Sequence, residues 1–171
     1  IAGFHQDISE LHAAHQALRE SLSRLSLACR LGWLGVFELG RRKDSLEFTC
    51  NEVFYEQFGL REGANAEERL AAVEKCILPE DRRRWRSLCR SEGWTVGFQE
   101  HVELRVNHPW RGLCWFAVAC EVVGTPEEPR IAGYVSDVTK HRQHERMLRE
   151  AKESAEAANA AKSIFLANMS H

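Results

Sequence analysis

Cysteine and histidine are the residue types in this chain whose chemistry can be judged from spacing. The chain has six cysteines and eight histidines. No two cysteines have the C-x-x-C spacing of a metal or redox motif, so we predict no metal site and reduced thiols that act as small buried hydrophobic residues. The alternative is a thiol redox sensor, in which Cys29 meets its twin in a dimer. The cysteines are Cys29, Cys50, Cys76, Cys89, Cys114 and Cys120.

The composition excludes two broad classes of function. A length of 171 residues with 44% hydrophobic residues fits one domain of about 100–150 residues plus extensions. A net charge of −2 argues against nucleic-acid binding. No apolar run approaches the roughly 18–20 residues of a membrane span, and no signal-peptide pattern opens the chain. We therefore expect a cytoplasmic module without nucleic-acid or membrane contact.

The two ends of the chain predict a piece of a larger protein. The first residue is Ile1 rather than methionine, and the last, His171, falls inside a strongly helical pattern. Any membrane anchor of the parent protein would lie upstream.

Residues 1–31 carry a heptad pattern typical of a dimerisation helix. Apolar residues alternate at intervals of four and three, which gives a single narrow seam. The arrangement that we expect is a parallel homodimer, and the alternative is a helix that folds back on the sheet of its own domain. The seam consists of Phe4, Ile8, Leu11, Leu18, Leu22 and Leu25, with His15 as its polar interruption and Cys29 at its end.

Residues 32–139 predict an α+β domain. Strands are expected at 34–39, 46–49, 98–106, 114–122 and 131–138, and helices at 51–60, 66–77 and 78–91. The last helix has a clear start, since Pro79 suits a first turn and Glu80 and Asp81 suit the helix dipole. This order predicts a five-stranded antiparallel sheet with its short helices on one face.

Large apolar residues of these strands and helices are expected to converge between the sheet and the helices. They would line a pocket for an apolar or aromatic effector, or simply fill the core. Trp115 has the opposite strand parity and is expected on the outer face, covered by the N-terminal helix or by a second protomer. The candidate pocket residues are Phe37, Phe48, Phe54, Phe58, Trp85, Phe98, Phe116, Val118 and Cys120.

Residues 140–171 predict a second coiled-coil helix without glycine or proline. Its seam includes Leu148, Ala151, Ala155 and Ala158. Alanines bury little apolar area, so this seam should be held weakly, as suits a helix that changes register or rotation.

The domain resembles a PAS domain of the subclass common in bacterial sensor kinases. Residues 78–82, Leu-Pro-Glu-Asp-Arg, are similar to the family's His-Pro-Asp-Asp-Arg helix start, with leucine replacing histidine. Phe37-Glu38-Leu39 stands where that subclass usually has Trp-Glu-Trp. Asp137, Val138 and Thr139 match the Asp-Ile-Thr motif that closes the last strand, and the resemblance implies that they relay signals into the following helix.

Residues 162–171, Lys-Ser-Ile-Phe-Leu-Ala-Asn-Met-Ser-His, resemble the start of the dimerisation and phosphoacceptor helix of sensor histidine kinases. The resemblance implies that His171 accepts phosphate from ATP, because a neutral imidazole is a competent nucleophile near pH 7. It also implies a response regulator or receiver domain as partner. ATP and Mg²⁺ would be held by a kinase domain that this chain lacks, so the chain alone should have no kinase activity.

A PAS fold does not identify a ligand. The Asn-Cys-Arg-Phe motif of flavin–thiol photosensors is missing, and the helix predicted at 78–91 has no histidine, so haem is not expected. A non-covalent flavin or another small apolar ligand stays open, and no cofactor is certain. The sequence thus predicts a signal-relay module of a two-component kinase, with a ligand-free dimerising spacer and a thiol redox sensor as alternatives.

Overall fold

The computed structural model describes residues 2–42, 45–60, 65–90 and 93–170, with side chains from residue 9 onward. The elements in chain order are α1 (Ala2–Leu31), β1 (Leu34–Arg42), β2 (Ser45–Cys50), α2 (Glu52–Phe58), α3 (Ala66–Cys76), α4 (Arg82–Cys89), β3 (Gln99–His108), β4 (Gly112–Gly124), β5 (Pro129–Asp137) and α5 (Thr139–Met169). The predicted order of strands and helices is confirmed.

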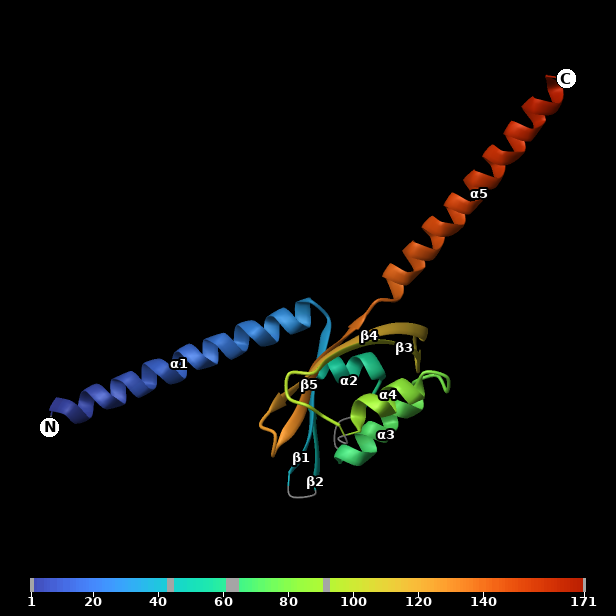
Figure 1. Cartoon of the computed structure of the whole chain (residues 1–171). Helices are drawn as coiled ribbons and strands as arrows, with labels where there is room; N and C mark the ends of the chain where they lie inside the picture. The colour runs from blue at the N-terminus through green and yellow to red at the C-terminus, as the bar shows by residue number, and fades with distance from the viewer. Residues whose placement is uncertain (1, 43–44, 61–64, 91–92, 171) are drawn as a thin grey trace.

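The five strands form one antiparallel sheet in the order β2-β1-β5-β4-β3. Figure 1 shows α2, α3 and α4 gathered on one side of this sheet. Strand β5 lies at the centre and leads directly into α5, so the last strand and the exit helix belong to one continuous segment.

Asn51 and Gly59 set the limits of α2. The Asn51 side chain accepts a hydrogen bond from the Phe54 amide at 3.0 Å, as an N-cap should. It also exchanges hydrogen bonds with the backbone of Leu34 and Val36 at 3.0 Å each, which fastens the helix start to β1. Gly59 ends the helix with φ = 64°, a conformation that favours glycine.

The start of α4 differs from the prediction. The helix begins at Arg82 rather than at residue 78, and Asp81 does not cap it with its side chain. The Asp81 carboxylate instead accepts hydrogen bonds from the backbone and the guanidinium of Arg105 on β3. Residues 78–81 therefore form a turn that is bound to the edge strand.

Six aromatic side chains fill the space between the sheet and the helices. They are at most 2% exposed, and neighbouring ring centroids lie 4.8–6.4 Å apart. Val118 is fully buried with them. This packing shows a filled core where the sequence left a pocket open. The six are Phe37, Phe48, Phe54, Phe58, Trp85 and Phe116.

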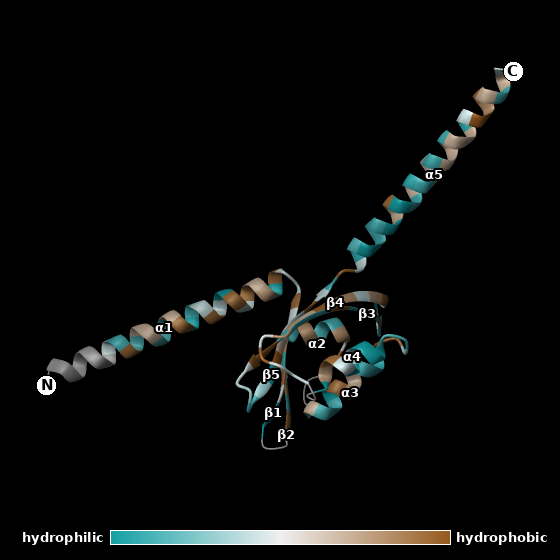
Figure 2. Ribbon diagram, viewed as in Figure 1, coloured by the Kyte–Doolittle hydropathy of each residue, from teal (hydrophilic) through white to brown (hydrophobic). Residues whose placement is uncertain are grey.

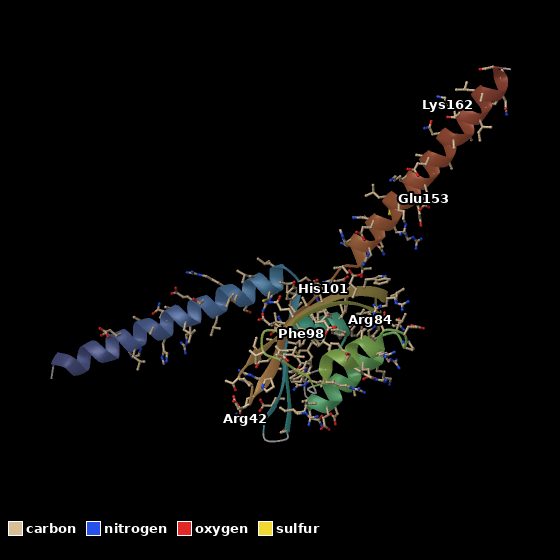
Figure 3. All side chains as sticks on the ribbon, in the orientation of Figure 1. Arg42, Arg84, Phe98, His101, Glu153 and Lys162 are labelled. Carbon is tan, nitrogen blue, oxygen red and sulfur yellow. The ribbon has the colours of Figure 1, made fainter. Side chains whose placement is uncertain are left out.

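Phe98 does not belong to this core, which corrects the prediction. It precedes the first residue of β3 and is 56% exposed; Figure 3 labels it. Gly97 has φ = 86°, and the Phe98 amide bonds Thr95 in a turn, so the strand's alternation does not extend to Phe98. Cys120 is only partly buried and packs at the margin of the core.

The two long helices leave the domain in different directions (Figure 1). Leu11, Leu18, Leu22 and Leu25 of the predicted seam are more than half exposed, whereas Cys29 at its end is partly buried. The helix does not fold back over the sheet (Figure 1). The α5 side chains, including the labelled Glu153 and Lys162, project into open space (Figure 3). Figure 2 shows polar and apolar residues mixed along both helices. The side chains of Phe4 and Ile8 lie outside the described residues.

Within the described part of the chain, no helix is both long and apolar enough to cross a lipid bilayer.

Candidate functional site

Asp137, Val138 and Thr139 form a tightly bonded junction between β5 and α5. The Val138 amide donates to the Trp115 carbonyl at 2.8 Å. The Trp115 amide donates to the Thr139 hydroxyl at 2.9 Å, and the Thr139 amide donates to Asp137 Oδ1 at 2.9 Å. The backbone of Trp115 on β4 therefore bonds both Val138, the last residue before α5, and Thr139, the first residue of α5.

The Asp137 carboxylate is also paired with the guanidinium of Arg111, which lies on the turn between β3 and β4. Burial alone would raise the pKa of Asp137, but hydrogen bonds from Thr139 and Arg111 outweigh it and hold the pKa below its ordinary value. Asp137 is therefore charged at neutral pH and joins three elements: β5, the β3–β4 turn and the start of α5.

The indole of Trp115 lies on the outer face of the sheet, as its parity predicts. In this single chain it is covered by guanidinium groups rather than by α1. The guanidinium carbons of Arg105 and Arg142 lie 5.8 and 5.7 Å from the Trp115 ring centroid, within the range of cation–π contacts. Arg142, in the first turn of α5, also bonds Glu103 on β3 through Nε at 2.9 Å. Sequence reasoning missed this contact.

The entry side of the domain is held by a buried amide. Gln57 on α2 is fully buried, and its Nε2 donates to the carbonyls of Trp33 at 2.8 Å and Val135 at 3.3 Å. Trp33 joins α1 to β1, and Val135 lies two residues before Asp137. A Cβ added to Gly35 would lie 2.3 Å from Gln57 Oε1, so a side chain at residue 35 would displace this amide. The Gln57 side chain therefore bonds both the segment that enters the domain and the strand that leads out of it.

A hollow of about 320 Å³ lies beside the C-terminal end of α4. Phe98 and Cys120, which the sequence assigned to the aromatic pocket, line this separate hollow with Leu88, Trp94 and Ile131. The Trp94 indole nitrogen is buried and has no hydrogen-bond partner. Ser87, Arg90 and Glu100 also line the hollow, and a buried N–H without an acceptor favours a ligand that brings one.

Burial makes most of the thiols poor nucleophiles. It raises the pKa of Cys89 to about 12, with Cys120 and Glu74 adding to the shift, and together with Glu100 it raises the pKa of Cys120 to about 11. Burial likewise raises the pKa of Cys50, Cys76 and Cys114. Because the thiolate is the reactive form, these five cysteines do not favour the redox alternative.

The segment that resembles a phosphoacceptor motif extends along an exposed part of α5. Residues 162–169 are helical and exposed, whereas His171 lies outside the described residues. Among the described residues, no group of three or more histidine, cysteine or acidic side chains is arranged to hold a metal ion.

Comparisons with solved structures show that the chain has a PAS fold. No family model and no curated protein matches the sequence. Among solved structures, the chain is similar to a sensory box histidine kinase/response regulator from Burkholderia thailandensis, with a TM-score of 0.54, 19% identity and coverage of 78% of this chain and 98% of that one. It is also similar to an RNA-binding light-oxygen-voltage receptor, with a TM-score of 0.53, 18% identity and coverage of 73% and 35%.

Replacing Asp137 by asparagine should lower the free energy of unfolding at pH 7 by about 1–3 kcal/mol, since hydrogen bonds to a buried charge are lost. The folded-state pKa of Asp137 is lowered, so its contribution is complete above the ordinary aspartate pKa of about 3.9 and is lost as the pH falls through the folded-state value. Urea titrations of both proteins should therefore begin to converge as the pH falls below about 4, and should coincide only below the folded-state pKa of Asp137. Glu38→Gln, which breaks the exposed pair with Arg130, is the control and should change little. An equal deficit at pH 7 and pH 3 would contradict the assignment.

Proposed function

From its PAS fold, we propose that this chain is the signal-relay module of a two-component sensor histidine kinase. The observation that carries the proposal is the bonded junction at Asp137, Val138 and Thr139. It fixes the first turn of α5 to the sheet, and α5 continues into the phosphoacceptor motif at 162–171. A displacement of β4 or β5 would therefore be passed to the helix that carries His171.

The filled aromatic core supports relay by the protein itself rather than by an effector held among those rings. Gln57 hydrogen-bonds both Trp33 at the entry and Val135 near the exit. A change in the direction of α1 would strain these bonds and move β5. This arrangement favours a relay between an upstream signal and α5.

The unpartnered faces of the molecule support a homodimer. Leu18, Leu22 and Leu25 of α1 are 56–63% exposed, and a heptad seam of this kind is buried when two helices pair. On the outer face of the sheet, Leu113 and Tyr134 are also exposed. A second copy supplies the matching apolar surfaces. The alanine seam of α5 would then pair weakly, which leaves that helix free to change its packing.

The reaction of this kinase would take place at His171. Its imidazole would accept the γ-phosphoryl group of ATP, which the kinase domain holds with Mg²⁺, and would pass it to a response regulator or receiver domain. The role of this chain in the reaction would be to set where that histidine lies.

A second function is favoured by the hollow beside Trp94. We propose that it binds a compact molecule with a hydrogen-bond acceptor, which would accept from the unpartnered Trp94 indole N–H and cover the exposed Phe98 ring. This function would make the module a sensor in its own right.

In the intact kinase, His171→Gln should abolish incorporation of phosphate from ATP, because the attacking nitrogen is lost. His144→Gln, a change to another histidine of α5, should retain it. Labelling with γ-³²P-ATP under identical conditions measures both variants. Full labelling of the His171 variant would refute the assignment of the phosphoacceptor.

Native mass spectrometry of the freshly purified chain should show a non-covalently bound mass. Trp94→Phe keeps the ring shape but removes the N–H donor and should lower its occupancy, by roughly tenfold for one hydrogen bond. Trp110→Phe alters an exposed indole and serves as the matched control. A wild-type chain that carries no extra mass, or equal occupancy in all three proteins, would leave ligand-free relay as the function of this domain.

A further inference from the structure

We propose that Trp115 is a positioning residue that couples α4 to α5 around the edge of the sheet, through side-chain contacts that add to the backbone bonds of the β5 junction. The regulatory meaning of this coupling rests on the proposed function. The coupling itself is a property of this chain alone, so the two can fail separately. Its members are Asp81, Arg105, Trp115, Arg142 and Glu103, which we call the edge relay.

The first part of the edge relay fastens the start of α4 to β3. Asp81 is only 6% exposed, and its two carboxylate oxygens accept from Arg105 Nε at 2.8 Å and Nη2 at 3.0 Å, while the Arg105 amide bonds the same carboxylate at 2.9 Å. The Leu78 amide also donates to the Arg105 carbonyl at 2.9 Å. The Arg105 guanidinium lowers the pKa of Asp81 and keeps the pair ionised. Because this pair is bidentate, the plane of the guanidinium follows the position of the α4 start.

The second part of the edge relay connects Arg105 to the first turn of α5. Arg105 and Trp115 are cross-strand partners on β3 and β4. The guanidinium groups of Arg105 and Arg142 both lie against the Trp115 ring. The Arg142 guanidinium is held by Glu103 and by Glu145 at 3.1 Å. The ring therefore contacts one cation that belongs to the α4 anchor and another that belongs to α5.

The geometry of the ring explains why a shift of one cation should affect the other. The carbons of both guanidiniums lie within 6 Å of the ring centroid, so each contact depends on where the indole sits. The Trp115 backbone meanwhile bonds Val138 and Thr139. A tilt of the indole would act on the side chain of Arg142 and on the backbone before it, and both belong to the first turn of α5.

The test is amide hydrogen exchange of the 171-residue chain, followed by NMR at residues 142–147. Asp81→Asn should raise their exchange rates by roughly 2- to 30-fold, the range to which coupling energies of this kind correspond. Glu74→Gln is the matched control, because it breaks another ion pair of α4, with Arg86, that does not contact Trp115. Equal exchange in the Asp81 and Glu74 variants would overturn the proposal.

A double-mutant cycle separates coupling from general loosening. Trp115→Leu should raise the same exchange rates, and Asp81→Asn added to it should have little further effect. Multiplicative effects of the two substitutions would show independent action and refute the relay.

The reciprocal measurement keeps the test decisive if Asp81→Asn fails to fold. Arg142→Gln alters an exposed side chain and should raise amide exchange at residues 84–88 of α4. Arg149→Gln, which alters a residue farther along α5, should leave amide exchange in α4 unchanged. Unchanged exchange in α4 with Arg142→Gln would overturn the proposal.

Discussion

Strand β4 holds the end of β5 and the start of α5 through the backbone of one residue. Trp115 bonds the Val138 amide with its carbonyl and the Thr139 hydroxyl with its amide, and Asp137 completes the turn by accepting from Thr139 and Arg111. Besides these bonds, α5 contacts the sheet through Arg142, which lies against the Trp115 ring and bonds Glu103. The direction of a 31-residue helix therefore depends on a few hydrogen bonds at its first turn.

The rest of the molecule divides into a closely packed domain and two helices that lack partners. The domain buries six aromatic rings between the sheet and its short helices, and it ties its own entrance and exit together through Gln57. The helices instead present apolar residues to solvent along α1 and small residues along α5. A closely packed domain between two exposed helices is the arrangement that the proposed relay of a structural change from α1 to α5 requires.

Much of this fold could be predicted from local patterns. Period-two alternation located β4 and placed Phe116 and Trp115 on opposite faces. The alternation of β3 predicts Phe98 in the core, yet Phe98 is the last residue of a turn that begins at Thr95, and the strand starts only at Gln99. The start of α4 was predicted too early because the role of Asp81 depends on Arg105, which lies 24 residues away. Arg111 with Asp137 and Arg142 with Trp115 were missed for the same reason, since each pair is brought together only by the register of the sheet.

Residual dipolar couplings of backbone amides test most directly whether the junction fixes α5 to the sheet. The account predicts that the amides of residues 140–146 fit the alignment tensor of the five strands, and that Thr139→Val, which removes the hydroxyl that accepts from the Trp115 amide, gives these residues a smaller, separate tensor. The account would be contradicted if residues 140–146 already required a separate tensor in the wild-type chain, because α5 would then reorient freely and no movement of the sheet could be passed along it.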